Sequence, residues 1–573
     1  MPDQVPPLLP GGKKDLSMEL RLLIAFVLMG VVLFVTPYFY KPAPVKGTTP
    51  VTPQKAEQMT KAPEPAAAPV PVAVAPTAAP GQVHAEKEDT FTVDTKLYRV
   101  VLSNKGAIVR SWTLKQYQDL GGKPIELVNT GAPDRVPPPF SIDFKDRKPE
   151  TDINQVLWVG KPAADNLGID YEFSDGRTTA HKSFRFGDNT YLTHVTSEVA
   201  VPGATLPHLL MWRAGFGDRT VQNVATVERA LYYDSGESKL NFKVAKDAKN
   251  GPVSFSGPYS FAGLEDTYFT GVALPTGTSN FELRAYSDAV PTGPERKEEN
   301  LIGVGLGGDG SNKFDLFIGP KDIDILRKVN PKLEQAVDWG RWFGWLAKPL
   351  FLALNYVNDN WTHNFGWAIV ILTIGLNMLL LPVRLSGLKS AKKMQALQPE
   401  LQKINAKYKN MSLRDPKQTE KNQETMDLYK RNGVNPVASG CVPMLFQFPF
   451  FIAFYTCLSV AIELRGAHWL WVSDLSRPEL LAIRVLPVLL VVTQFLSQSL
   501  TPAAPGVDPA QQKAMKFMPL VMGFMFYYQS AGLVLYWLTG NLVGIVQQSL
   551  MNRATRPPAT AAVVDIKPLK PKR

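Results

Sequence analysis

A long apolar run between residues 365 and 383 carries polar side chains that a helix surrounded by lipid does not need. Thr373 and Asn377 are four residues apart and share one helix face, to which Arg384 returns about 10 Å further along. Pro382 lacks an amide proton and loosens the end of this helix. A single polar residue in a membrane helix usually bonds a neighbouring helix. A line of such residues indicates contact with water or with a polar ligand.

Three further apolar runs carry the same kind of mark. Polar groups on four helices indicate a shared wet cavity, because unpaired polar groups are costly in lipid. Hydrogen bonding between helices remains the alternative. The predicted cavity residues are Thr373, Asn377, Arg384, Gln447, Gln494, Gln498, Asn541 and Gln548, with Phe451 and Trp537 on the same faces and Pro382, Pro443 and Pro449 as helix-breaking positions.

The chain shows no residue pattern for catalysis. Its six histidines are scattered without the spacing of metal ligands. Cys441 and Cys457 lie in one apolar run and are expected to be small buried hydrophobes. The glycine-rich segment 303–313 lacks the ending of a phosphate-binding loop, so it is interpreted as a turn. We therefore predict no enzyme activity, no cofactor and no metal.

The distribution of apolar residues over the 573 positions predicts two kinds of structure. These are a membrane α-helical bundle of six spans, five of which form the core, and an all-β periplasmic sandwich domain. No cleavage site follows the first span, which is therefore expected to be an uncleaved anchor. The predicted segments are a cytoplasmic N-terminus at 1–19, spans at 20–40, 363–384, 441–462, 480–500, 515–529 and 532–551, a Pro/Ala-rich disordered linker at 41–88, the β domain at 89–330, an amphipathic interfacial helix at 332–349, a cytoplasmic basic helical hairpin at 385–437, a periplasmic loop at 463–479, a cytoplasmic loop at 501–514 and a basic cytoplasmic tail at 552–573.

Alternating apolar and polar residues predict the strands of the β domain. The segments "KLNFKV", "NFELRA" and "KFDLFIG" each place apolar side chains on one face only, which favours antiparallel sheets. After this domain, Trp339, Trp342, Phe343 and Leu346 fall on one helical face. That pattern predicts a helix lying in the headgroup layer of the membrane; a helix packed on the β domain is the alternative.

Basic residues gather on one side of the predicted spans. The segment 384–433 holds twelve lysines or arginines and five acidic residues, and the tail after Met551 is also basic. The positive-inside rule places this segment and both termini in the cytoplasm. The β domain then lies in the periplasm.

The cytoplasmic segment is expected to form two antiparallel helices. Apolar residues from Met394 to Tyr408 follow the 3,4 spacing of a coiled-coil seam. A basic exterior suits ribosomal RNA or anionic lipid, and a merely solvated face is the alternative. The lysines predicted to make this contact are Lys389, Lys392, Lys393, Lys403 and Lys407.

These segments resemble a known family. In the helical half the resemblance rests on "LQPELQKI", "LYKRNGVNPVASGCVPMLFQFPFFIAFY", "DPAQQKAMKFMPLVMGFMF" and "SAGLVLYWLTGNLVGIVQQ"; in the β half it rests on "LSNKGAIVRSWTLKQY" and "LFIGPKDIDILRKVNPKLEQAVDWG". The chain resembles the bacterial membrane protein insertases of the YidC/Oxa/Alb superfamily over nearly its whole length. The order and spacing of so many segments make the resemblance specific.

The resemblance implies an insertase and chaperone for nascent inner-membrane proteins, acting alone or with the Sec translocon and without nucleotide hydrolysis. It implies a hydrophilic groove that is open to the cytoplasm and to lipid, and a substrate exit path at Phe448, Phe451 and Trp537. The implied partners are nascent membrane proteins, the ribosome, the Sec translocon and the phospholipid bilayer, and no DNA.

One departure from the family pattern concerns the groove. The family has an arginine five residues before the proline that ends the second span, and here that position is Asn377. Arg384 lies on the same face near the rim, where it can reach water. We expect Asn377→Ala to weaken insertion mildly and Asn377→Arg to be tolerated.

Two other classes of function remain open from the residues alone. A solute transporter or channel predicts internal repeats and a path open on both sides, and the two halves show no repeat. A membrane-anchored binding module would act through its β domain and would leave the polar stripes and the basic hairpin without a role. Deletion of residues 89–320 separates this class from an insertase, which would keep most of its function.

Overall fold

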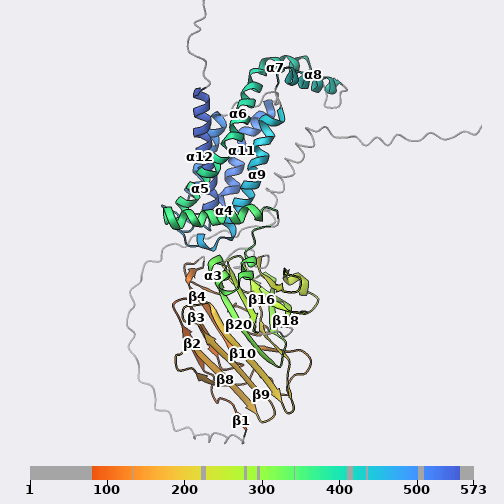
Figure 1. Cartoon of the computed structure of the whole chain (residues 1–573), viewed down its shortest axis with the longest axis vertical. Helices are drawn as coiled ribbons and strands as arrows, with labels where there is room; N and C mark the ends of the chain where they lie inside the picture. Colours follow the sequence, from red (N-terminus) through yellow and green to blue (C-terminus); the bar gives the residue numbers. More distant parts are fainter. Residues whose placement is uncertain are drawn as a thin grey trace, which may run out of the picture. The chain divides into compact units, whose positions relative to one another are not determined.

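The computed structural model describes most of the chain (Figure 1). The chain divides into two units, residues 1–76 and 77–573, and every described residue belongs to the second. The predicted first span and the basic tail from 555 onward lie outside the described residues, as do the linker to residue 80 and the loop at 501–508. The described ranges are 81–119, 121–132, 134–220, 227–276, 281–292, 297–340, 342–408, 417–433, 436–500 and 509–554.

The first half of the described chain is an antiparallel β domain of three sheets. The largest sheet has the order β1-β8-β9-β10-β20-β17-β16-β13-β14, with β7 paired to β8 and β11 to β10. Its strands are β1 (Gln82–Val83), β7 (Val159–Pro162), β8 (Gly168–Asp175), β9 (Thr179–Phe186), β10 (Leu192–Val201), β11 (Ala204–Thr205), β13 (Arg229–Asp234), β14 (Lys239–Lys243), β16 (Tyr259–Glu265), β17 (Phe269–Pro275) and β20 (Ser311–Pro320).

Two smaller sheets complete the β domain. One has the order β15-β18-β19-β12-β6 and the other β2-β3-β4-β5. Their strands are β2 (Thr90–Asp94), β3 (Tyr98–Ser103), β4 (Ile108–Gln118), β5 (Pro124–Glu126), β6 (Ile142–Phe144), β12 (His208–Trp212), β15 (Val253–Gly257), β18 (Phe281–Thr292) and β19 (Lys297–Gly307). Leu264 and Ile318 of the largest sheet line one small apolar cavity together with Leu210 and Val304 of the five-stranded sheet, so these two sheets face each other as in a sandwich.

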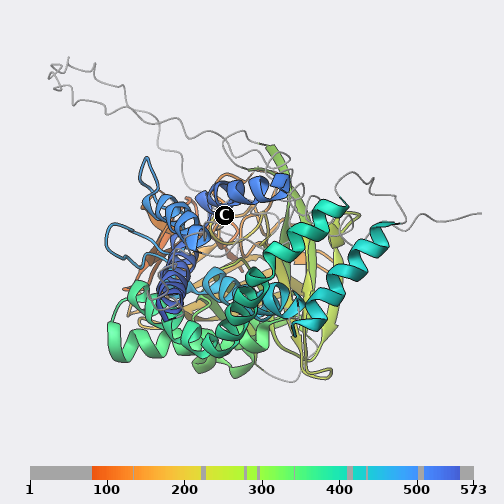
Figure 2. The ribbon, with the colours of Figure 1, turned by 90° about the horizontal axis from the view of Figure 1, so that it is seen from above.

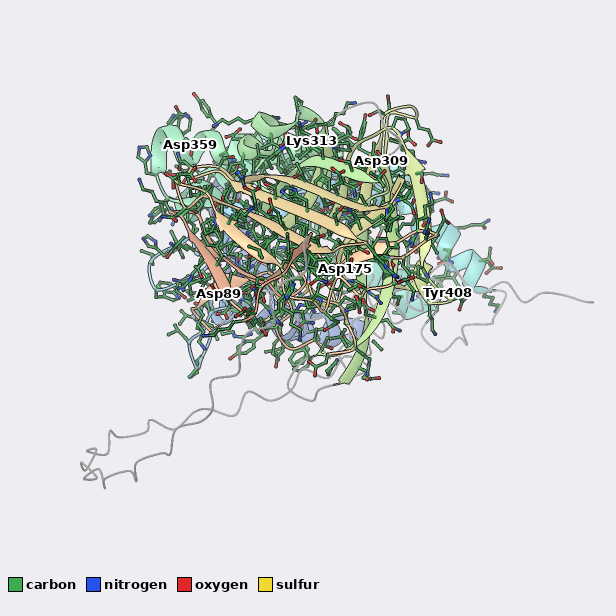
Figure 3. All side chains as sticks on the ribbon, turned by 90° about the horizontal axis from the view of Figure 1, so that it is seen from below. Asp89, Asp175, Asp309, Lys313, Asp359 and Tyr408 are labelled. Atoms are coloured by element: carbon green, nitrogen blue, oxygen red, sulfur yellow. The ribbon has the colours of Figure 1, made fainter. Side chains whose placement is uncertain are left out.

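The alternating segments form strands as the pattern predicts. The first five residues of "KLNFKV" form β14, the last five of "NFELRA" lie in β18, and "KFDLFIG" lies in β20. The glycine-rich segment covers the end of β19, the turn at 308–310 and the start of β20. Gly307 and Gly308 adopt φ values of 130° and 113° that favour glycine. Figure 3 labels Asp309 and Lys313 at this turn and at the start of β20. The segment is therefore a hairpin turn and not a phosphate loop.

A buried lysine joins separate parts of the β domain. Lys182 of β9 is fully buried, and its Nζ donates to the carbonyl oxygens of Gly106, Ala107 and Phe140 at 2.8, 3.1 and 2.8 Å. The same Nζ lies 5.2 Å from the ring centre of Trp158. Burial lowers the pKa of Lys182 to about 7. Three carbonyl acceptors match the three donors of a protonated lysine, so this group ties two loops to the largest sheet.

The second half of the described chain is helical. Its elements are α3 (Ile323–Val329), α4 (Gly344–Val357), α5 (Phe365–Leu379), α6 (Leu381–Ala396), α7 (Gln398–Lys407), α8 (Lys417–Arg431), α9 (Pro436–Val460), α10 (Val485–Leu500), α11 (Pro509–Tyr527) and α12 (Ala531–Ala554), with 3-10 helices at Pro331–Ala336 and Ile462–Leu464 and a π-helical turn at Asn358–Thr362. Helices α10 and α12 pack together, as do α5 and α12, α6 and α9, and α4 and α9.

The six predicted spans are not confirmed. Among the described residues, no single helix combines the length and the apolar character needed to cross a membrane. One pair of helical segments has the necessary length and apolar character when its two members are taken together: Gly344–Thr362 and Phe365–Leu379. The chain bends by 116° between them. The predicted span at 363–384 is divided at Leu380 into α5 and α6, and the first residues of the predicted span at 480–500 precede α10.

The helix predicted at 332–349 is wrong in its position. A 3-10 helix ends at Ala336, the chain turns at Gly340 with a φ of 79°, and α4 begins only at Gly344. Trp339, Phe343 and Leu346 pack against the core. The exposed aromatic residues of the described segment 342–362 are Trp342, Trp345, Tyr356 and Trp361. That α4 lies in the headgroup layer of the membrane stays a prediction, which now rests on these exposed aromatic residues.

The predicted antiparallel hairpin is formed by α7 and α8. Lys407 of α7 pairs with Glu424 of α8 at 2.6 Å, and Leu397 and Leu401 cluster with Tyr429 near the other end of α8. In Figure 1 and in the view from above in Figure 2, α7 and α8 extend away from the other helices. The helical segment breaks at Leu397, two residues before Pro399. Proline has no amide proton to donate to the preceding turn, so it interrupts a helix but is accepted in the first turn of the next one, here α7.

We predict that Lys182→Met lowers the free energy of unfolding of the β domain by about 1–3 kcal/mol, because buried carbonyl groups lose their donor. Lys161→Met is the control, since the Lys161 side chain is 60% exposed. Hydrogen exchange of the β9 amides in the full chain measures the effect. An equal or greater stability of Lys182→Met would mean that the desolvation of the ammonium outweighs its hydrogen bonds.

Candidate functional site

Thr373 and Asn377 lie on the buried face of α5. Thr373 is fully buried, and its Oγ1 donates to the carbonyl oxygen of Ile369 at 2.6 Å. The Nδ2 of Asn377 donates to the carbonyl oxygen of Thr373 at 2.7 Å. A Cβ atom added at Gly540 of α12 would lie 4.0 Å from that Nδ2. Asn377 therefore faces α12 and keeps its amide oxygen for another partner.

Arg384 joins three helices. It lies in the first turns of α6, and its Nη2 donates to Oε1 of Gln447 on α9 at 3.2 Å. Its Nη1 donates to Oε1 of Gln547 on α12 at 3.3 Å. A Cβ atom added at Gly544 would lie 3.7 Å from the same Nη1. Two neutral side-chain amides thus accept hydrogen bonds from a partly buried guanidinium group between α6, α9 and α12.

The sequence pattern predicted Gln548 as a cavity residue, whereas Gln547 is the residue that bonds Arg384. Both glutamines are buried, but they face different neighbours. Gly540, Gly544 and Gln547 follow the i, i+4, i+7 spacing of one helix face, and that face is turned toward Asn377 and Arg384. This glycine spacing could have indicated that Gln547 lies at a helix contact, because small residues mark close helix contacts in membranes.

A second polar cluster lies between α10 and α12. The Nδ2 of Asn541 donates to Oε1 of Gln494 at 2.7 Å. Gln548 donates to Asn552 at 3.1 Å, and Asn552 donates to the carbonyl oxygen of Leu500 at 3.3 Å. Gln498 is partly buried on α10. The predicted polar residues therefore form two clusters on different faces of α12.

Aromatic side chains lie beside the first cluster. The rings of Phe451 and Trp537 are 5.1 Å apart and nearly perpendicular, and Phe526 of α11 lies 4.9 Å from Trp537. Phe448 is 51% exposed on the outer side of α9. The helix-breaking prediction is wrong for Pro443 and Pro449, because α9 continues through both positions, whereas Pro382 is the second residue of α6.

Several buried polar atoms between these helices have no hydrogen-bond partner among the described residues. They are Oδ1 of Asn377, Nε2 of Gln547 and Nε1 of Trp537. Buried polar groups in native proteins are almost always paired, often with water. Gln547 bonds Arg384, and Trp537 packs on Phe451. Unpaired polar atoms at these positions favour an interior that accepts water or polar groups of a ligand.

The remaining predicted residues lie on α6 and α7. Lys389, Lys393, Lys403 and Lys407 are exposed, and the side chain of Lys392 is outside the described residues. Within the described part of the chain, no group of three or more histidine, cysteine, aspartate or glutamate side chains is placed to hold a metal ion.

Comparisons with known proteins define the class. The family model of the YidC periplasmic domain matches residues 90–353, and that of the 60Kd inner membrane protein matches residues 357–558. These two matches define a membrane protein with a periplasmic β domain followed by a helical region.

Two relatives matched over nearly their whole length identify the family. The Membrane protein insertase YidC of Syntrophus aciditrophicus is 33% identical and covers 94% of this chain and 100% of its own length. That of Geotalea daltonii is 32% identical over 94% of this chain and 99% of its own. The solved structure of an active YidC insertase with its first transmembrane domain resolved covers 93% of this chain and 99% of its own, at 18% identity and a TM-score of 0.35. The chain belongs to the YidC family of membrane protein insertases.

We predict that Gln547→Leu destabilises the helical region more than Gln548→Leu does. A hydrogen bond to a charged group contributes about 1.5–3 kcal/mol and one between neutral groups about 1 kcal/mol. Gln547 accepts from a guanidinium group and Gln548 donates to an amide, so the adjacent glutamine is a matched control. Thermal unfolding of both variants in detergent gives the comparison, and equal melting temperatures would contradict a charged interaction at Gln547.

Proposed function

We propose that this chain inserts nascent inner-membrane proteins through a hydrophilic groove between α5, α6, α9 and α12. The observation that carries this proposal is a partly buried Arg384 held by two glutamines beside unpaired polar atoms. Such a site offers a charge and hydrogen-bonding groups to the polar tail of a client. A tail that must pass lipid without them loses several kcal/mol per unpaired group.

Insertion in this scheme needs no nucleotide. A client span of about 20 apolar residues gains free energy on entering lipid, and the groove lowers the cost of carrying polar residues part of the way. The client span leaves along Phe448, Phe451 and Trp537. The exposed side of Phe448 and its nearness to Phe451 in sequence support this path.

The cation of the groove is Arg384 in this proposal. It takes the role of a charge that the family pattern places at the position of Asn377. Both side chains face α12 beside a glycine, at Gly540 and Gly544. Arg384 therefore captures acidic client tails about two helical turns nearer the cytoplasm.

The basic hairpin and the Sec translocon complete the proposal. The exposed lysines of α6 and α7 suit the phosphates of ribosomal RNA or anionic lipid. Clients reach the groove from the ribosome directly or from the translocon, and the protein also serves them as a chaperone. The β domain lies in the periplasm, and both termini lie in the cytoplasm.

A photocrosslinking experiment tests the groove. A photoreactive amino acid at position 373 or 377 should form strong adducts with a short single-span membrane protein held on a stalled ribosome. Position 371 is the matched control on the same helix, because Ile371 is 37% exposed whereas Thr373 is fully buried. Equal adducts from all three positions, or none with intact protein in the membrane, would make the buried amides contacts between helices and would favour a transporter.

A charge transposition tests the role of Arg384. We expect Arg384→Gln to lower insertion at least tenfold for a client with an acidic tail and far less for a neutral tail. Addition of Asn377→Arg should restore much of the loss, because the two positions share a face. Protease protection of the inserted client measures insertion, with Asn377→Ala as the mild variant. If Arg384→Gln lowers insertion equally for clients with acidic and with neutral tails, the guanidinium group stabilises helix packing and does not bind the tail.

A further inference from the structure

The segment between α9 and α10, residues 461–484 and here called the α9–α10 loop, contacts the β domain through two arginines. The Arg465 side chain is 3% exposed and pairs with Asp218, whose side chain is 2% exposed. Its Nη2 and Nε also donate to the carbonyl oxygen of Gln118, at 2.8 and 3.3 Å. Its guanidinium carbon lies 5.3 and 5.5 Å from the ring centres of Tyr268 and Phe269.

Arg477 holds the same end of β4. Its Nη2 donates to the carbonyl oxygen of Gln118 at 2.9 Å and its Nη1 to that of Asp119 at 3.1 Å. Asp474 fixes the Arg477 side chain from within the loop at 3.0 Å. Two arginines that are 12 positions apart in sequence therefore share one carbonyl group at the end of a strand.

The acidic partner is also held in place. Asp218 accepts from the backbone amide of Thr220 at 2.8 Å, and its own amide donates to Asp266 at 2.9 Å. A buried ion pair whose partners are held by further hydrogen bonds fixes one geometry, and loss of one partner leaves an uncompensated buried charge. The contact is therefore a specific attachment and differs from an exposed surface pair.

The same loop carries the start of α12. The first amides of a helix have no acceptor within the helix. In α12, the amide of Ala531 donates to the carbonyl oxygen of Arg477 at 2.7 Å, and that of Gly532 donates to the carbonyl of Leu475 at 2.9 Å. Arg477 thus holds the β domain with its side chain and α12 with its carbonyl group.

The loop also contacts the start of α5. The Nδ2 of Asn364 donates to the carbonyl oxygen of His468 at 2.9 Å. The ring of Trp469 packs so closely on Gly366 that a Cβ atom there would lie 2.2 Å from it. The loop therefore contacts the starts of both helices whose later turns carry Asn377 and Gln547.

We propose that the α9–α10 loop is a docking site for the β domain, and that this docking sets the position of the start of α12. A change on the β side of the contact then reaches α12 through the backbone of residues 475–477. This inference does not depend on what the groove binds.

Hydrogen exchange of the full chain in detergent tests the proposal. Asp218→Asn should speed exchange of the amides of Ala531 and Gly532 by about tenfold, since opening of the loop frees them. Asp288→Asn is the matched control, because Asp288 is a buried partner of Arg213 within the β domain. Arg465→Lys is the second variant: it keeps the positive charge but cannot make the same set of contacts.

The outcomes separate the proposal from general destabilisation. Faster exchange at residues 531 and 532 in Asp218→Asn and in Arg465→Lys, with unchanged exchange in β10 and β20, supports it. Unchanged exchange at residues 531 and 532 in both variants overturns it. Equal acceleration in Asp288→Asn overturns it as well, because any loss of a buried pair would then loosen α12.

Discussion

A guanidinium group that is removed from water must be met by acceptors, and the packing of α6, α9 and α12 follows from how Arg384 meets this need. Two of its three nitrogens donate to glutamines on two different helices. The Arg384 side chain lies against α12 at Gly544. Neutral amides accept two of its five N–H groups without cancelling the charge. The group can therefore still bind an anionic partner.

The β domain uses basic side chains in a related way. Lys182 donates to three backbone carbonyls inside the domain, and Arg465 and Arg477 donate to carbonyls at the end of β4. A carbonyl acceptor belongs to the backbone, so it depends on the local fold and not on a side chain. Such contacts join segments that are distant in sequence.

Local patterns predicted much of the architecture. The strand in "KLNFKV" has a period of two, and the buried face of α5 has Thr373 and Asn377 four residues apart, so each signal lies within one element. The predicted helix at 332–349 was wrong in its position because the apolar residues keep a helical spacing across the turn at Gly340. Arg465 was missed because its partner lies 247 residues away, and no local pattern reports such a contact. The partner of Gln547 lies 163 residues away, and the only local signal was the spacing of Gly540 and Gly544 on the same helix face.

The attachments of the α9–α10 loop have a consequence for chain length. Arg465 and Arg477 bond the end of β4, Trp469 packs on Gly366 at the start of α5, and Leu475 accepts from the start of α12. Little spare backbone lies between these four residues. An inserted or deleted residue within 465–477 would put these groups out of register with their partners. Variation in length among relatives should therefore avoid this stretch, although loops outside the core of a fold usually tolerate it. Affinity tags and reporter domains belong in other surface turns.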